Sequence, residues 1–353
     1  MIELTRGNVL KADAEALVNT VNTVGFMGKG IALQFKKAFP ANYEAYHRAC
    51  KTGEVVQGRM HVFETGRMMN PKYIINFPTK RHWRGKSKIE DIEHGLNDLL
   101  KIVRQLGIKS IAIPPLGCGL GGLDWGQVRR LIEEKFREAN DIRVLLYEPV
   151  GAPDHSDMPI GTSRPKWTSS RALVVLAMHR YSQLAYRLTL LEIQKLAYFL
   201  QEAGEPLRLQ FKKGLYGPYA HNLNKVLERM EGHFTRGYGD TQKPDVEIEL
   251  VKGIAEEAIE FLNSEQESVQ RLDVVADIIE GFETPFGMEL LSSVYWVTHE
   301  DDNPARDTET TIRQVHDWNE RKRSLFSSAQ IAAAWRRLEE KGWLDMGSKP
   351  HKF

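Results

Sequence analysis

Short apolar runs alternate with longer amphipathic stretches along the first 150 residues of the chain. The apolar runs resemble strands, and they lie at residues 2–5, 16–19, 60–64, 73–78, 110–116 and 143–147. Between them, apolar side chains recur at helical spacing over residues 30–39, 42–51, 89–106 and 124–140. This alternation predicts an α/β fold with a largely parallel or mixed sheet between helices. Ligands of such sheets bind in loops at the carboxyl ends of strands, so the functional residues are expected in those loops.

The pattern changes near residue 150. Residues 148–170 are rich in Pro, Gly, Ser and Asp and have no apolar period, which predicts a linker. Beyond it, "LTLLEIQKLAYFLQEAG" has an apolar stripe that Gly204 ends, and "SSAQIAAAWRRLEEKGWLD" has Ser327 or Ser328 as N-cap and Gly342 at its end. We therefore expect a first domain over residues 1–152, a linker over 153–170 and a mainly α-helical domain over 171–353.

Composition adds two constraints. The chain has 353 residues, 42% of them hydrophobic, which favours two domains over one. Its two cysteines, Cys50 and Cys118, cannot make a disulfide framework, which is typical of a reducing, cytoplasmic setting. The N-terminus has no signal-peptide pattern, and no stretch has the length of a membrane span, so we expect a cytoplasmic protein without membrane contact.

The net charge of +1 conceals an imbalance between the two halves. Residues 1–150 hold 23 Lys and Arg against 16 Asp and Glu, a charge of +7, and residues 151–353 hold 25 against 31, a charge of −6. A basic half favours a polyanionic partner, and an acidic half favours a basic surface. Chance imbalance between two ordinary domains is the alternative.

Two glycine-rich loops each lead from a strand into a helix. In "NTVNTVGFMGKGIALQF", Gly28 and Gly30 let the backbone approach a ligand, and the helix that begins near Ile31 directs its N-terminus there. In "IPPLGCGLGGLDW", Gly117, Gly119 and Gly122 satisfy G-x-G-x-x-G. That motif alone would favour a dinucleotide-dependent oxidoreductase, but it follows a late strand and a second glycine loop accompanies it. Two such loops predict a diphosphate held from both sides.

Two further loops carry polar groups. Asn8 follows Gly7 after the first strand, where its side chain and the N–H of Val9 suit the edge of a base. In "INFPTKRHWRGKSK", Thr79 and Lys80 follow the strand, and a lysine there suits a nucleophile or an acid–base group. The next residues combine positive charge with an aromatic ring, which suits single-stranded nucleic acid; a solvated basic loop is the alternative. The contact candidates are Arg81, His82, Trp83 and Arg84.

With "GNVL", "NTVGFMGKGIALQF", "NFPTK" and "IPPLGCGLGGLDW" in this order, residues 1–150 resemble the macrodomains, an ADP-ribose-binding family, and within it the branch that removes ADP-ribose through a lysine. The resemblance implies that Asn8 and Val9 hold the adenine and that Lys80 is catalytic. It also implies that the ribose next to the reacting bond and the diphosphate are bound by Thr20, Val21, Asn22, Gly28, Gly30, Ile31, Thr79, Gly117, Cys118, Gly119, Leu120 and Gly121. In one departure, related lysine-dependent hydrolases have an aspartate where this chain has Gly121.

The second half, with "YGPY" at residues 216–219, resembles helical antitoxin domains that recognise toxins. Together the two halves imply an antitoxin that hydrolyses the N-glycosidic bond between ADP-ribose and thymine bases of single-stranded DNA. They also imply that the antitoxin neutralises, by direct binding through residues 171–353, the cognate DNA ADP-ribosyltransferase toxin. The expected partners are ADP-ribose, ADP-ribosylated single-stranded DNA and that toxin; no cofactor and no metal are expected. The alternative is a non-catalytic ADP-ribose reader that sequesters a protein partner.

Overall fold

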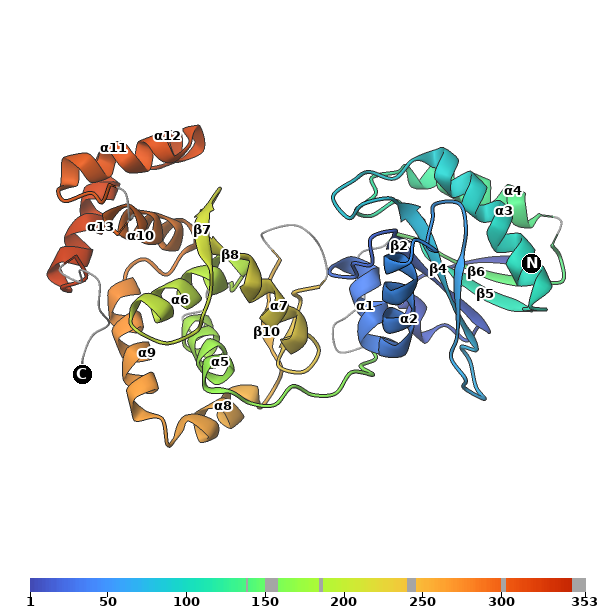
Figure 1. Ribbon diagram of the computed structural model, residues 1–353, viewed down its shortest axis with the longest axis horizontal. Helices are drawn as coiled ribbons and strands as arrows, with labels where there is room; N and C mark the ends of the chain where they lie inside the picture. The colour runs from blue at the N-terminus through green and yellow to red at the C-terminus, as the bar shows by residue number, and fades with distance from the viewer. Residues whose placement is uncertain (138, 150–157, 184–186, 240–245, 300–302, 345–353) are drawn as a thin grey trace. The chain divides into compact units, whose positions relative to one another are not determined.

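The computed structural model describes residues 1–137, 139–149, 158–183, 187–239, 246–299 and 303–344 (Figure 1). The chain divides into two compact units, each with its own core. The first, here called the α/β unit, comprises Met1–Arg164 and a short segment that begins at Gly239. The second, here called the helical unit, comprises the rest of the chain from Pro165 onward. The first part of the predicted linker, residues 153–157, lies outside the described residues.

A six-stranded mixed sheet forms the centre of the α/β unit, with the order β1-β6-β5-β2-β4-β3. All neighbours are parallel except β3, which pairs with β4 in the antiparallel sense. The strands are β1 Ile2–Thr5, β2 Ala16–Asn22, β3 His61–Glu64, β4 Tyr73–Lys80, β5 Ser110–Ile113 and β6 Arg143–Tyr147. The helices are the 3₁₀ helix η1 Val9–Lys11 and α1 Gly30–Ala38, α2 Pro40–Lys51, α3 Ile89–Gln105 and α4 Trp125–Phe136.

Strand periodicity divides the core between the two faces of this sheet. Ala16 and Val18 of β2 pack with α3 and α4 on one face, whereas Leu17 between them packs with η1 and α1 on the other. Figure 1 shows the same layers, with α1 and α2 on one side of the sheet and α3 and α4 on the other. Because successive side chains of a strand point to opposite faces, a strand covered on both faces is apolar throughout. The predicted mixed sheet between helices is confirmed.

Three strands end elsewhere than predicted. β2 continues past residue 19 to Asn22, so Thr20, Val21 and Asn22 are strand residues. The fifth predicted strand ends at Ile113 rather than at residue 116, because Pro114 and Pro115 have no N–H for the ladder. In contrast, β4 continues past Pro78 to Lys80. The partner β3 extends along β4 only as far as Asn76, so beyond that point the outer edge of β4 requires no donor and a proline is tolerated. Thr79 and Lys80 are therefore strand residues, not loop residues.

The helical unit confirms the mainly α-helical second half. Its helices are α5 Ser169–Ser182, α6 Leu190–Glu202, α7 His221–Met230, α8 Ile254–Leu262, α9 Gln266–Ile279, α10 Pro285–Thr298, α11 Thr308–Trp318, α12 Glu320–Leu325 and α13 Ser328–Glu340. Pattern reading missed the hairpin of β7 Phe211–Gly214 and β8 Gly217–Ala220 and the short pair β9 Thr235–Arg236 and β10 Glu249–Leu250. Ser327 is the N-cap of α13 and forms a capping box with Gln330.

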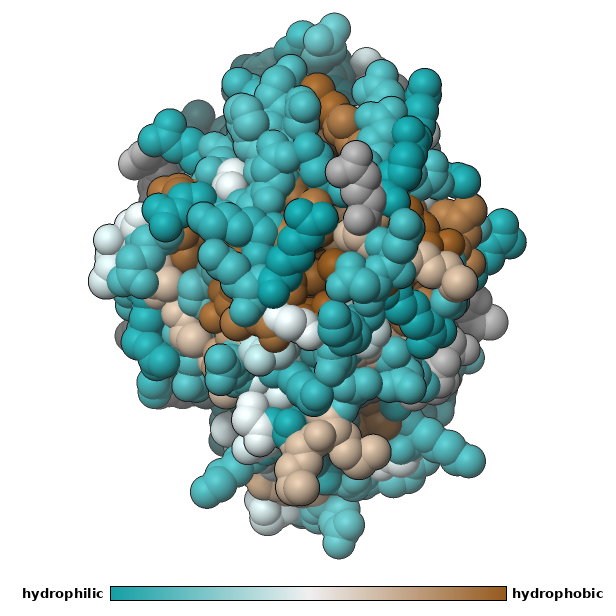
Figure 2. Space-filling view, turned by 90° about the vertical axis from the view of Figure 1, so that its right-hand side faces the viewer, coloured by the Kyte–Doolittle hydropathy of each residue, from teal (hydrophilic) through white to brown (hydrophobic). Residues whose placement is uncertain are grey.

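Two further observations concern the polarity of the surface and the length of the helices. Figure 2 shows a mainly hydrophilic face on which hydrophobic residues gather in small, separated patches. None of the helices in the described ranges combines the length and the apolarity that crossing a bilayer requires.

Candidate functional site

The sheet topology brings the predicted loops to one edge. β2 runs parallel to both of its neighbours, β4 and β5, so the segments that follow Asn22, Lys80 and Ile113 leave the sheet on the same side. β1 is parallel to β6 and β6 to β5, so the turn at Asn8 lies at that edge too. The four loops that carry the predicted residues therefore surround the carboxyl edge of a single sheet, where ligands of such folds bind.

Asn22 shapes the loop between β2 and α1. Its Oδ1 accepts from the N–H of Val24 at 3.0 Å and of Phe26 at 3.3 Å, and its Nδ2 donates to the carbonyl of Phe26 at 2.6 Å. The hydroxyl of Tyr46 donates to the Asn22 carbonyl at 2.6 Å, and burial raises the pKa of Tyr46, so it remains a donor. The predicted ribose contact of Asn22 would compete with these bonds and stays a prediction.

The two glycines of this loop, Gly28 and Gly30, have different surroundings. Gly30 has φ +58°, a conformation that favours glycine, and it begins α1. The N-cap of α1, Lys29, makes no side-chain capping bond, so its side chain does not satisfy the first turn. Gly28 is buried beneath the ring of Phe26: a Cβ at Gly28 would lie 2.3 Å from Phe26 Cε1. Phe26, which pattern reading missed, therefore covers this part of the predicted ligand loop.

The loop after β5 has no room for side chains at its centre. A Cβ at Gly121 would lie 2.2 Å from Ser87 Oγ and 2.3 Å from the carbonyl oxygen of Gly117. Gly117 itself has φ +70°. The aspartate of related hydrolases therefore has no place at position 121 in this backbone. The buried Ser87 Oγ has no hydrogen-bond partner, which leaves a polar atom unpaired beneath the loop.

The same loop faces the start of α1. Leu120 is 37% exposed, and its Cδ1 lies 3.8 Å from the position of a Cβ at Gly30, so the two glycine loops approach one another there. Burial and the nearby Asp124 carboxylate raise the pKa of the Cys118 thiol to about 11, which suits a loop residue rather than a nucleophile. Asp124 accepts from the N–H of Gln127 at 2.9 Å and is the N-cap of α4.

Lys80 is the last residue of β4, and its amine reaches the loop after β5. Nζ donates to the carbonyl of Leu120 at 3.3 Å. Burial, and after it the positive charge of Lys86, lowers the pKa of Lys80. This charge comes from Lys86, although Arg81 and Arg84 lie nearer to Lys80 in the sequence. Thr79, which precedes Lys80, is buried, and its hydroxyl donates to the carbonyl of Val21 at 3.4 Å.

The remaining β2 and β1 residues lie beside these loops. Thr20 and Val21 pair with Phe77 and Pro78 near the end of β2, and Val21 is buried. Asn8 caps η1: its Oδ1 accepts from the N–H of Leu10 at 3.0 Å. Val9 is buried beneath it, and Ile31, in the first turn of α1, is half-buried. Ligand contacts of all these residues stay predictions.

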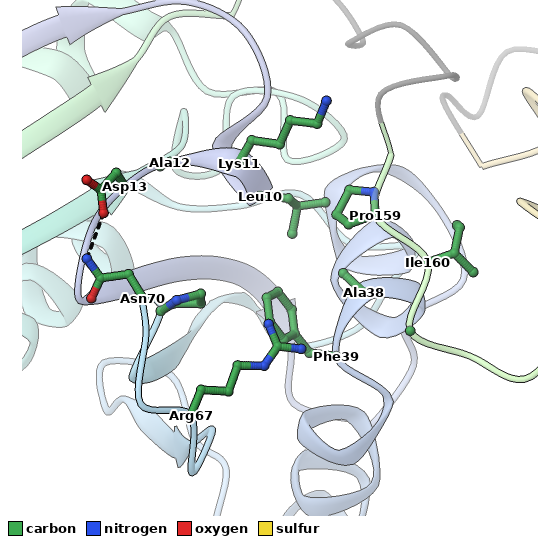
Figure 3. Close-up of a pocket in the computed structure, with 12 residues that line it drawn as sticks. Leu10, Lys11, Ala12, Asp13, Ala38, Phe39, Arg67, Asn70, Pro159 and Ile160 are labelled. Atoms are coloured by element: carbon green, nitrogen blue, oxygen red, sulfur yellow. Dashed lines mark hydrogen bonds between the residues drawn. The ribbon is translucent and has the colours of Figure 1, made fainter.

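A cavity of about 370 Å³ lies elsewhere in the α/β unit (Figure 3). It is lined by Leu10–Asp13, Ala38, Phe39, Arg67, Asn70, Pro71 and Pro159–Gly161. Asp13 and Pro71 precede β2 and β4, so this cavity reaches the amino edge of the sheet and includes none of the predicted ADP-ribose-binding residues. Among the described residues, no three His, Cys, Asp or Glu side chains are grouped so that they could hold a metal ion.

The α/β unit is a macrodomain: the family model of the Macro domain matches residues 18–132. A DNA ADP-ribosyl glycohydrolase of Thermus aquaticus is 45% identical over 98% of this chain and 94% of its own length. One of Mycobacterium tuberculosis is 41% identical over 96% of this chain and 99% of its own. These relatives show that the chain belongs to the DNA ADP-ribosyl glycohydrolase family and is a hydrolase, which confirms the resemblance seen in the sequence.

A third relative joins two activities in one chain. A DNA ADP-ribosyl transferase-DNA ADP-ribosyl glycohydrolase fusion protein of Thermosipho africanus is 35% identical over 42% of this chain and 42% of its own length.

Proposed function

We propose that the α/β unit removes ADP-ribose from a thymine base of single-stranded DNA, and that Lys80 is its catalytic residue. The observation that carries the proposal is the position of Lys80, at the carboxyl end of a central strand with its amine against the glycine loop after β5, together with its lowered pKa. A lowered pKa increases the neutral fraction of an amine, and only the neutral amine is a nucleophile.

The reaction we propose has two steps. The Lys80 amine attacks the anomeric carbon of the ribose next to the base, the glycosidic bond breaks, and its electron pair leaves with the base nitrogen, which takes a proton from water. The hydroxide so formed accepts the proton that Nζ loses when it bonds to carbon. A water molecule then attacks the same carbon, the bond to Nζ breaks with its electron pair on nitrogen, and one proton of that water passes to Nζ, which returns the neutral amine and releases ADP-ribose. Water is the proton source in this scheme because position 121 has no carboxylate and Asp124 caps α4.

The proposed binding site distributes the rest of ADP-ribose over the four loops. Asn8 and Val9 would hold the adenine, and the backbone of Gly28, Gly30 and Gly117–Gly121 would surround the diphosphate and the adjoining ribose. Glycines permit that close approach, and the start of α1 favours negative charge. The N–H of Gly30 there donates to the carbonyl of Gly239 at 2.6 Å, so the N–H groups after it would meet the diphosphate. Thr20, Val21, Ile31 and Thr79 would complete the ribose side.

A turnover assay with the full chain tests the catalytic proposal. Single-stranded DNA that bears ADP-ribose on thymine is incubated with wild type, Lys80→Ala and the matched control Lys101→Ala, an exposed lysine of α3. We expect Lys80→Ala to lose about 10²- to 10⁴-fold of the rate while ADP-ribose still binds, and Lys101→Ala to act as wild type. Tight binding of ADP-ribose without turnover by wild type would instead identify a reader.

We further propose that the helical unit binds and neutralises a DNA ADP-ribosyltransferase toxin in the cytoplasm. The fusion relative supports a functional link between the two activities, and the charge of −6 over residues 151–353 suits the basic groove of a DNA-binding enzyme. The Lys80→Ala variant separates the two roles. Premixed with the transferase, it should block modification of DNA at a one-to-one ratio; failure to do so would leave removal as the sole antitoxin activity.

A further inference from the structure

Three aromatic rings gather beside Lys80, although they come from two different loops. Phe26 belongs to the loop between β2 and α1, whereas His82 and Trp83 follow β4. The ring centroids of Phe26 and Trp83 are 5.6 Å apart, and those of His82 and Trp83 are 5.3 Å apart. The guanidinium carbon of Arg84 lies 4.5 Å from the Trp83 ring centroid, within cation–π range. A continuous aromatic surface therefore begins two residues from the proposed catalytic amine.

The two loops are fastened together, so this surface is preformed. The backbone N–H of Thr23 donates to the carbonyl of Arg81 at 3.1 Å, and its hydroxyl donates to the same oxygen at 2.9 Å. Asn22 holds the backbone of Phe26 at both its N–H and its carbonyl. A rigid ring pays little conformational entropy when a ligand stacks on it.

Phe26 and His82 of this group are exposed, whereas Trp83 is half-buried. Phe26 is 45% exposed, whereas the phenylalanines of the core are buried. Its ring rests on the backbone of Gly28 in the proposed ADP-ribose loop. Positive charge surrounds the rings: residues 80–88 contain five Lys and Arg and no Asp or Glu. An exposed aromatic platform within a basic segment is the arrangement that binds single strands, by stacking bases and attracting phosphates.

We propose that Phe26 and Trp83 are positioning residues that stack a nucleobase of the modified strand and so hold the glycosidic bond in front of Lys80. The proposal rests on the DNA substrate proposed above. Under this proposal, the Phe26–Trp83 surface contributes to the binding of ADP-ribosylated DNA but not to the binding of free ADP-ribose. The surface would therefore determine which class of substrate the site accepts. Arg84, stacked on Trp83, would bind the adjoining phosphate.

Steady-state kinetics of the full chain tests this division. On ADP-ribosylated single-stranded DNA, Phe26→Ala and Trp83→Ala should each lower kcat/KM about tenfold or more, mainly through KM, because one base–aromatic stack is lost. Their affinity for free ADP-ribose should stay within about twofold of wild type. Phe26→Tyr and Trp83→Phe should restore most of the loss. The matched control is Leu4→Ala, which removes an equally exposed apolar side chain (44%) on β1.

The outcomes separate this proposal from the proposed function. If wild type hydrolyses the adduct and both alanine variants match it, the stacking surface is wrong and the hydrolase stands. If the variants lose ADP-ribose affinity to the same extent as DNA turnover, the rings support the loop and do not read a base. Should wild type show no turnover, fluorescence anisotropy with Lys80→Ala still decides the matter: adding Phe26→Ala or Trp83→Ala must weaken binding of the labelled, modified oligonucleotide about tenfold.

Discussion

The two units of the chain differ in how far their lysines are buried: Lys80 is half-buried, whereas two lysines of the helical unit are fully buried. In the α/β unit, Lys80 ends a strand at the open edge of the sheet, and its amine donates to one loop carbonyl at 3.3 Å. In the helical unit, Lys195 on α6 and Lys322 on α12 are both at most 1% exposed. Lys195 donates to the carbonyl of Pro218 at 2.6 Å, and Lys322 donates to Glu289 at 2.7 Å and Ser293 at 2.9 Å.

Desolvation lowers the pKa of all three amines, that of Lys195 to about 7. A lowered pKa is therefore no sign of catalysis by itself, because structural networks produce it too. What distinguishes Lys80 is its position: it ends a strand at the carboxyl edge of the sheet, and its amine contacts the glycine loop after β5 at Leu120. Lys195 and Lys322 face hydrogen-bond partners inside a core.

The buried lysines of the helical unit account for part of the "YGPY" sequence. Gly217 has φ +95°, and a Cβ there would lie 3.0 Å from Ser293 Oγ and 3.2 Å from Lys195 Nζ. The β7–β8 hairpin thus crosses directly over the amine of Lys195, which binds the next residue, Pro218. Only a glycine combines this conformation with so little room.

The largest expected effect tests the structural role of these charges. Glu289→Ala leaves Lys322 and Arg321 without the carboxylate that both contact, and removal of one partner from a buried ion pair costs about 3–5 kcal/mol. Calorimetry should show the unfolding transition of the helical unit moving down while that of the α/β unit and the hydrolase rate remain. The control is Glu260→Ala, an exposed glutamate of α8. A shift of the helical transition no larger than that of the control would mean that the cluster is not structural.

The next largest effect is expected at Gly121, where the backbone leaves no room for a side chain. Gly121→Ala places a Cβ against Ser87 Oγ and the backbone of Gly117, and overpacking of this kind costs about 1–3 kcal/mol. Because the loop must shift, we expect ADP-ribose affinity to fall roughly tenfold in isothermal titration. Gly107→Ala is the control: it lies in the turn before β5, at the other edge of the sheet, and a Cβ there meets no atom within 4 Å. Equal affinity of the two variants would show that the loop yields without consequence for the ligand.

The third prediction tests whether the charge of Lys86, and not that of Lys88, lowers the pKa of Lys80. Lys86⁺ lowers the pKa of Lys80, so Lys86→Gln should raise it. The neutral amine then appears at higher pH, and the rising limb of the kcat/KM–pH profile should move toward alkaline pH, with lost activity at neutral pH and recovery above it. Lys88→Gln removes the same charge two residues further on and should lower DNA affinity without moving the limb. A profile unchanged in Lys86→Gln would contradict a nucleophilic Lys80.

Local signals allowed the sequence to predict most of this architecture. Strand periodicity located β1 to β6, and glycines next to strand ends located the loops, since turn chemistry and periodicity involve only neighbours in the chain. Contacts between loops were beyond such signals. Nothing local indicates that Lys86 rather than Arg84 lies near Lys80, or that Ser87 supports Gly121. Phe26 did offer a signal, an aromatic residue inside a polar glycine loop.

The smallest expected effect lies in the predicted linker, part of which belongs to the α/β unit. Gly161 donates its N–H to the carbonyl of Lys37 at the end of α1, at 2.7 Å, and Met158 Sδ accepts from Asn8 Nδ2 at 3.5 Å. Met158 thereby orients the side chain proposed to hold the adenine, so Met158→Ala should weaken ADP-ribose binding about threefold to fivefold, a loss of roughly 1 kcal/mol or less. Ribose 5-phosphate, which lacks the adenine, should bind both forms equally weakly. Met68→Ala, which removes a side chain that is 98% exposed, is the control. An equal loss for both ligands would place the effect of Met158 on the fold of the unit and not on the recognition of the base.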